Sequence, residues 1–264
     1  MRLQVTVTRG DAFITGLPQQ AFTVLEDGKP QTIATFQSRE EPVSVVLVID
    51  DSGSRRDLMS VRRIAQTLVN AVNPESEIGV MSFRSDETHL DLPLSQDRAK
   101  IAASLRPANL RGGSLILDSC LAAVQYLAKA GKYDKRIVVM LTDGDDNASR
   151  ATPDEVRAAL VRNDVLIYAL RPVDSGRGTS RERSSREQLT ALAGPTGGTV
   201  YESKMFIELE QAAERIAREI RSQYVLTYTP ANQALNGKVR KITVKVDPPD
   251  KKKVTVRTRS GRMP

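Results

Sequence analysis

Short apolar runs alternate with amphipathic stretches through the middle of the chain. The apolar runs predict buried strands at residues 43–49, 77–83, 136–142 and 165–170, and a weaker one at 198–201. Between them, apolar residues recur with the helical period, which predicts helices at 57–72, 96–105, 115–130, 153–163, 185–193 and 206–221. Alternating strands and helices imply an α/β fold with a doubly wound, mostly parallel sheet. We therefore expect residues 42–221 to form one α/β domain.

The two ends of the chain carry the two-residue alternation of β structure instead. Residues 1–41 show it on both sides of a turn signal at Glu26–Pro30, and residues 222–264 show it in three further runs. Neither segment holds enough strand to be stable alone, so we expect the two to pair into a small β domain. The polar stretch 174–187 is expected to be a loop.

The most informative motif follows the first strand of the α/β domain. The apolar run Val45–Ile49 ends abruptly in Asp50, which begins an Asp-x-Ser-x-Ser motif completed by Ser52 and Ser54. Alternate residues of an extended chain face the same way, so these three oxygen side chains can converge on one point. One carboxylate and two hydroxyls suit a hard divalent cation, and we favour Mg²⁺ or Mn²⁺ over Ca²⁺.

Two further segments can contribute to the same point. In an open α/β sheet, ligands bind at the carboxyl ends of the strands. The strand at 136–142 runs directly into Asp143 and Gly144, which places a second carboxylate at that edge. The glycine-rich loop 111–114 ends in Ser114, whose hydroxyl can approach the two acids. The expected metal ligands are therefore Asp50, Ser52, Ser54, Ser114 and Asp143.

This set resembles the metal-ion-dependent adhesion site of von Willebrand factor A domains, which combines Asp-x-Ser-x-Ser with a later Thr and a later Asp-Gly. Ser114 stands in the place of the Thr and keeps its hydroxyl. The flanks 22–33 and 221–230 resemble those of a bacterial, chiefly acidobacterial, group of A-domain-related proteins. The resemblance implies a cation-dependent module, not an enzyme, that binds an acidic side chain of a protein or peptide. It also implies an extracytoplasmic or secreted location.

Two other functional hypotheses remain open at this stage. The first is a metal-free scaffolding domain whose β segments and basic C-terminal region mediate the interactions. The second is a metal-assisted hydrolase, which needs a general base beside the ion, and no residue other than the expected ligands suits that role. A nucleotide enzyme is disfavoured because the chain has neither a phosphate-binding loop nor a dinucleotide fingerprint after its first buried strand.

Charge is concentrated at one end of the chain. The net charge is +7, and residues 238–264 hold ten Lys or Arg and two Asp, a local charge of +8. Such a segment can attract an anionic surface, or it can be the solvated edge of a sheet, where lysine discourages aggregation. The absence of Trp and the presence of only six Tyr and five Phe disfavour a nucleic-acid partner, which needs stacking groups.

The remaining chemistry of the chain favours structural roles. Asp51, Asp145 and Asp146 are expected on solvated loops, where they can add negative charge near the ion. His89 lies in an alternating stretch typical of a strand, and Cys120, the only cysteine, lies among apolar residues of a predicted helix.

No apolar run approaches the ~20 residues that span a bilayer. The first residues lack a signal-peptide pattern, so the protein is cytoplasmic or its targeting segment is absent from this sequence.

Overall fold

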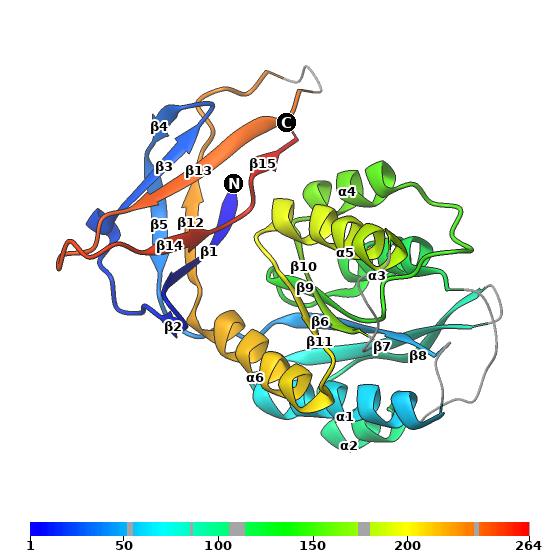
Figure 1. Cartoon of the computed structure of the whole chain (residues 1–264). Helices are drawn as coiled ribbons and strands as arrows, with labels where there is room; N and C mark the ends of the chain where they lie inside the picture. Colours follow the sequence, from blue (N-terminus) through cyan, green and yellow to red (C-terminus); the bar gives the residue numbers. More distant parts are fainter. Residues whose placement is uncertain (52–54, 85–86, 106–113, 174–179, 235–237, 264) are drawn as a thin grey trace.

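The computed structural model describes residues 1–51, 55–84, 87–105, 114–173, 180–234 and 238–263. Figure 1 shows an α/β body whose sheet has helices on both faces, with a smaller β sandwich beside it. Within the described residues, no helix is long and apolar enough to span a membrane.

A six-stranded sheet forms the centre of the α/β body, in the order β11-β10-β9-β6-β7-β8. Its strands are β6 (Ser44–Asp50), β7 (Glu77–Arg84), β8 (Glu87–Ser95), β9 (Arg136–Leu141), β10 (Val165–Pro172) and β11 (Val200–Ser203). All neighbours are parallel except β7 and β8. The predicted doubly wound, mostly parallel sheet is therefore confirmed. β8 adds an antiparallel edge strand to the five predicted strands. It contains Pro93, and proline is tolerated in an edge strand because its missing N–H is not needed for strand pairing.

Two hydrophobic clusters cover the two faces of this sheet. Along β6, Val45, Leu47 and Ile49 pack on one face, while Val46 and Val48 pack on the other. This two-sided burial explains why the strand reads as an unbroken apolar run. The helices are α1 (Arg55–Ala71), α2 (Arg98–Ser104), α3 (Ile116–Ala130), α4 (Pro153–Arg162), α5 (Ser180–Ala193) and α6 (Phe206–Ser222). The first cluster contains residues of α1, α2 and α6, and the second contains residues of α3, α4 and α5.

The start of α5 differs from the sequence prediction. The predicted helix begins at residue 185, but α5 begins at Ser180, so residues 180–184 of the expected polar loop are helical. The apolar anchors Leu189 and Leu192 lie in the second half, so the first half carries no helical periodicity that the sequence could reveal. Residues 174–179 of that expected loop lie outside the described residues.

The terminal segments form two antiparallel sheets that pack as a sandwich. The first has the order β14-β1-β12-β5 with β2 beside β1, and the second has the order β15-β13-β3-β4. Each combines strands from both ends of the chain: β1 pairs with β12, and β3 pairs with β13. The expected small β domain built from both ends is therefore present. Its strands are β1 (Arg2–Arg9), β2 (Ala12–Phe13), β3 (Phe22–Glu26), β4 (Lys29–Gln31), β5 (Ile33–Gln37), β12 (Tyr224–Tyr228), β13 (Arg240–Val246), β14 (Thr255–Arg257) and β15 (Gly261–Arg262).

The turn between β3 and β4 follows from its sequence. Asp27 and Gly28 both have positive φ, at 49° and 78°. Two successive residues with positive φ form a type I′ turn, whose twist matches that of the two flanking strands. The sequence Asp-Gly favours this turn type. Lys29 then pairs with Glu26 in the antiparallel register.

The sandwich and the α/β body are joined by buried polar contacts. Glu219 of α6 is fully buried, accepts hydrogen bonds from Tyr168 Oη at 2.8 Å and Thr6 Oγ1 at 3.2 Å, and forms an ion pair with Arg257. Arg259 donates to Asp164 Oδ1 and to the Val161 carbonyl, both at 2.6 Å. These contacts tie β1 and the chain around β14 to β10, α6 and the end of α4.

Candidate metal centre

Asp50 and Asp143 lie at the same edge of the sheet because their strands are parallel neighbours. β6 ends at Asp50, β9 ends at Leu141, and Ile49 is paired with Leu141. Thr142 connects the two strand ends: its hydroxyl donates to Asp50 Oδ2 at 2.8 Å and accepts from the Gly144 amide at 3.0 Å. Asp50 is 7% exposed, so its carboxylate is held at the edge of the core.

Asp143 is exposed, and its loop is fixed through the backbone. Its Oδ1 accepts from the Asp145 amide at 3.0 Å, and its carbonyl accepts from Arg171 Nε at 2.7 Å. Gly144 has a φ of 84°, and a Cβ there would meet Leu189 Cδ1 at 2.9 Å. The positive φ favours glycine at this position, and a larger residue would also crowd the Leu189 side chain.

Ser114 is bonded to the loop that follows Asp143. Its amide donates to Asn147 Oδ1 at 2.9 Å, and its carbonyl accepts from the amides of Asn147 and Ala148, each at 3.2 Å. The residue is 5% exposed. The structure therefore brings the Ser114 backbone, Asp50 and the Asp143 loop to one sheet edge. Ser52 and Ser54 lie outside the described residues.

The side chains described at this sheet edge are of the kinds that bind a hard cation. It offers carboxylate and hydroxyl oxygens, which Mg²⁺ and Mn²⁺ prefer. Among the described residues, no group of three or more His, Cys, Asp or Glu side chains is placed to hold a metal ion. A cation at this edge therefore needs the hydroxyl ligands as well as the two acids.

The neighbouring acids are not the solvated loop residues that the sequence suggested. Asp51 is 1% exposed and forms an ion pair with Arg62 of α1. Asp146 accepts from the Leu117 amide at 2.8 Å at the start of α3, and from the Ser149 amide at 3.1 Å. Thr142 and Asp146 escaped sequence reasoning because the Asp50 carboxylate and the Leu117 amide lie 92 and 29 residues away in the chain, and Asp51 escaped it because its partner lies on the next helix. The only sequence feature that could have pointed to Thr142 is its position between the buried strand and Asp143.

His89 and Cys120 lie in structural surroundings. His89 is on β8, where its Nε2 lies 3.8 Å from Glu87 of the same strand. Cys120 is fully buried in α3, and burial raises the pKa of its thiol to about 12. A thiol with that pKa is protonated at neutral pH and is a poor nucleophile.

Comparison with known families identifies the α/β body. The sequence model described as "von Willebrand factor type A domain" matches residues 44–215. Calcium-activated chloride channel regulator 1 of Equus caballus is 30% identical over 149 residues, and that of Homo sapiens is 30% identical over 165 residues. These matches cover 50% and 58% of this chain and 16% of each relative.

Solved structures share the fold at low identity. The von Willebrand factor type A protein from Catenulispora acidiphila has a TM-score of 0.57 at 13% identity, covering 99% of this chain and 73% of that one. The pilus adhesin SpaC from Lactobacillus rhamnosus GG has a TM-score of 0.55 at 14% identity, covering 83% and 34%. The first likeness extends across nearly the whole chain, terminal sheets included.

Proposed function

Because the chain belongs to the von Willebrand factor type A domain family, we propose that it is a divalent-cation-dependent module that binds an acidic group of a protein or peptide partner. Asp50, Ser52, Ser54, Ser114 and Asp143 would hold Mg²⁺ or Mn²⁺. The observation that carries the proposal is the Thr142 hydroxyl bond, which joins the Asp50 strand end to the Asp143 loop.

The charge and exposure of these residues suggest how a partner is bound. Two carboxylates and neutral hydroxyls would leave an open coordination position on a divalent ion, which the carboxylate of a partner can fill. Asp143 is exposed, so this edge is reachable, whereas Asp50 is held in place by Thr142. The bound cation would supply the electrostatic attraction, and the protein would supply the fixed geometry.

The comparisons support binding in preference to catalysis. Members of this family are generally binding modules, and a pilus adhesin and a minor pilin are among the proteins with similar folds. We therefore place the protein with adhesion-type domains and propose an extracytoplasmic or secreted location. The proposal therefore includes no enzymatic step.

A thermal-shift titration with Mg²⁺, Mn²⁺ and Ca²⁺ tests the metal site. A cation that binds only the folded state raises the melting temperature with concentration. We expect a saturable rise with Mg²⁺ and Mn²⁺ that disappears in Asp50→Ala and Asp143→Ala. Asp247→Ala, an exposed acid of the sandwich, is the matched control and should behave like the parent. If the folded parent shows no rise with any ion, the metal-free scaffolding hypothesis replaces this one.

A further inference from the structure

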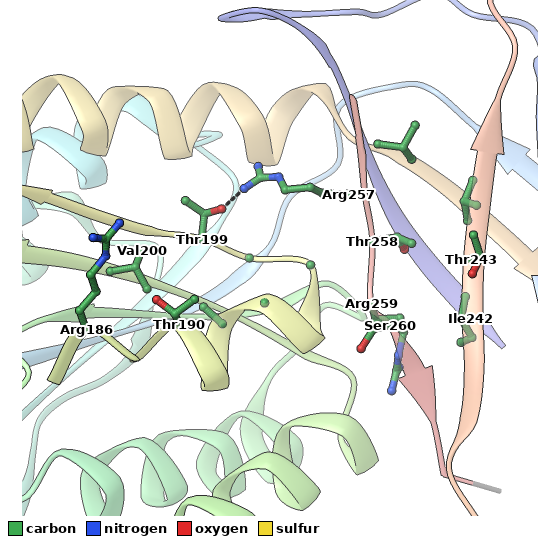
Figure 2. Close-up of a pocket in the computed structure, with 16 residues that line it drawn as sticks. Arg186, Thr190, Thr199, Val200, Ile242, Thr243, Arg257, Thr258, Arg259 and Ser260 are labelled. Atoms are coloured by element: carbon green, nitrogen blue, oxygen red, sulfur yellow. Dashed lines mark hydrogen bonds between the residues drawn. The ribbon is translucent and has the colours of Figure 1, made fainter. Parts of the chain in front are cut away.

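The arginines of the basic segment 238–264 are engaged in the fold. Arg257 forms an ion pair with the buried Glu219 and donates to Thr199 of the α/β body (Figure 2). Arg259 forms an ion pair with Asp164. The other two arginines of the segment pair with acids of the sandwich: Arg240 with Asp27 and Arg262 with Glu26. The charge that this segment can offer to a partner therefore comes from its lysines.

Four of these lysines gather where β13 ends and the chain turns back towards β14: Lys245, Lys251, Lys252 and Lys253. All four are exposed, and none forms an ion pair among the described residues. The Lys251 amide donates to the Pro248 carbonyl at 2.9 Å, and this turn brings the three consecutive lysines back beside the end of the strand. We call this cluster the lysine tip.

Little negative charge opposes the lysine tip. The connection between β13 and β14 contains two acids, Asp247 and Asp250. Asp250 forms an ion pair with Arg9 at 2.9 Å, and the hydrogen bond from Arg9 lowers the pKa of that carboxyl. Asp247 is therefore the one acid of this connection that is left to balance four ammonium groups, and the tip is strongly positive.

The fold itself does not account for these lysines. Three of the four lie outside any strand, so they do not protect a strand edge from pairing. Lys251 has a φ of 54°, in the left-handed region that residues other than glycine adopt rarely. Residues held in such conformations are concentrated at functional sites. The feature that needs an explanation is therefore the charge of the side chains.

The lysine tip and the candidate metal centre lie at opposite ends of the molecule. The sandwich is attached at the amino ends of the central strands, because Arg2 of β1 pairs with Glu41 and Asp134, which precede β6 and β9. The metal centre lies at the carboxyl ends of the same strands. Beyond the attachment, the chain between β13 and β14 projects on the side of the sandwich away from the α/β body (Figure 1).

We propose that the lysine tip is an attachment site for an anionic lipid membrane surface. A projecting cluster brings all of its charges to a flat surface at once, whereas an anionic chain gains most from a groove that follows it. Residues 245–254 contain no aromatic side chain, so a nucleic acid finds no stacking partner there. Lysine is a compact, exposed charge that suits phosphate headgroups.

The expected attachment is weak and reversible. Each lysine near an anionic membrane strengthens binding about fivefold, so four give a dissociation constant of about 1 mM in lipid. The attachment itself needs no metal. A protein held by its tip presents the opposite end of the α/β body away from the membrane, and the benefit of this orientation for partner binding rests on the proposed function.

Co-sedimentation of the whole chain with vesicles of phosphatidylcholine and about 30% phosphatidylglycerol tests the proposal. The triple substitution Lys251→Gly, Lys252→Gln and Lys253→Gln removes three charges, and glycine suits the positive φ of the first position. We expect this variant to bind the vesicles at least tenfold more weakly than the parent. We also expect the parent to lose binding between about 50 and 500 mM NaCl, and to ignore vesicles of phosphatidylcholine alone.

A second triple variant is the matched control. Lys100→Gln, Lys129→Gln and Lys204→Gln remove three exposed lysines from the α/β body and lower the net charge equally, so this variant should bind like the parent. Melting temperatures establish that both variants are folded. Asp50→Ala, with or without EDTA, should also bind the vesicles like the parent, which separates this proposal from the metal site.

Four results would overturn the proposal. These are no binding of the parent to the anionic vesicles, equal binding of the parent and the folded tip variant, an equal loss in the control variant, and loss of binding in EDTA. Tip-dependent binding to soluble heparin that is at least tenfold tighter per anionic group than binding to the vesicles would instead assign the tip to an anionic polysaccharide.

Discussion

At the scale of single residues, Thr142 decides how the two acids of the candidate metal centre are held. Its hydroxyl donates to Asp50 and accepts from Gly144, so one side chain joins two strand ends. Thr142 is 2% exposed and Asp50 is 7% exposed, so the bond between them is largely shielded from solvent. The position of the Asp50 carboxylate therefore depends on this hydroxyl.

Thr142→Val removes the hydroxyl while keeping the size of the side chain. We expect a loss of unfolding free energy of about 1–3 kcal/mol, because a buried carboxylate and a buried amide each lose a partner. We also expect cation affinity to fall about 10–100-fold, the usual effect of removing a group that orients a ligand. Urea unfolding and calorimetric titration with Mn²⁺ measure the two effects. Thr142→Ser, which retains the hydroxyl, should stay close to the parent in both, and equal affinities for all three proteins would contradict this role.

A second residue-scale feature is the buried Lys135 before β9. It is 3% exposed, and its ammonium group donates to the Ile220 carbonyl near the end of α6. Burial lowers the pKa of Lys135 to about 7, against opposing effects of Glu41, Glu219 and Glu40, while Arg2 lowers it further. The folded protein therefore releases this proton at a lower pH than the unfolded chain, whose lysine has a pKa of about 10.4.

The sign of the resulting pH dependence follows from this difference. Between about pH 7 and pH 10.4 the unfolded chain binds more protons at Lys135, so this residue makes stability rise with pH, by at most about 1.4 kcal/mol per pH unit. We expect the unfolding free energy of the parent, relative to Lys135→Met, to increase from pH 6.5 to pH 9.5 in urea titrations. If the difference in unfolding free energy between the two proteins stays constant or falls with pH, burial does not lower the pKa of Lys135 below that of the unfolded chain, and the prediction is wrong.

At the scale of elements, the loop after β9 joins the candidate metal centre to α5. Gly144 lies in this loop with a positive φ, directly against Leu189 and Ser185 of α5. The Arg171 guanidinium of β10 fixes the same loop through the Asp143 carbonyl. The conformation of the loop is thus set by its packing on α5 and β10.

Gly144→Ala tests that packing. The added Cβ would meet Leu189 Cδ1 at 2.9 Å and Ser185 Cβ at 3.2 Å in an unfavourable backbone region. We expect a loss of stability of about 1–3 kcal/mol, with weakened cation binding. Gly194→Ala, where a Cβ has open space, should change the unfolding free energy by less than about 1 kcal/mol. Equal effects of the two substitutions in urea unfolding would contradict this explanation.

The elements that the sequence predicted are those with a local signal. The apolar run of β6 and its end at Asp50 were predicted correctly, because a strand buried on both faces consists almost entirely of apolar residues. The first half of α5 and the pairing of Asp51 with Arg62 were missed. The first half of α5 has no apolar periodicity, and the ion pair of Asp51 depends on how α1 packs against the end of β6, so neither has a local sequence pattern.

At the scale of the whole molecule, the sandwich and the α/β body are joined by a short connection and by direct hydrogen bonds. One residue, Gln223, separates α6 from β12, and Arg259 reaches from the chain after β14 to the end of α4. Gly197 allows this approach, since a Cβ there would lie 2.8 Å from the Thr258 carbonyl carbon. The sequence predicted the sandwich but not this junction, because its contacts join residues nearly a hundred positions apart.

Arg259→Met should loosen the junction. The substitution leaves Asp164 and the Val161 carbonyl without their guanidinium partner, and we expect a loss of about 2–4 kcal/mol, less than for a fully buried pair because Asp164 is partly exposed. Calorimetry should show one unfolding transition in the parent and a lower melting temperature in the variant. Arg63→Met, which breaks an exposed pair with Glu210, should change stability by less than about 1 kcal/mol. Two separate transitions in the parent would contradict this joined arrangement.

The central claim is that a divalent cation binds at the edge shared by β6 and β9. The most direct measurement is anomalous scattering at the manganese edge from crystals grown with Mn²⁺. The account predicts one strong peak within coordinating distance of Asp50 and the hydroxyls of Ser52, Ser54 and Ser114, with Asp143 binding directly or through water. Crystals saturated with Mn²⁺ that show no peak at this edge, or a peak only elsewhere, would contradict it.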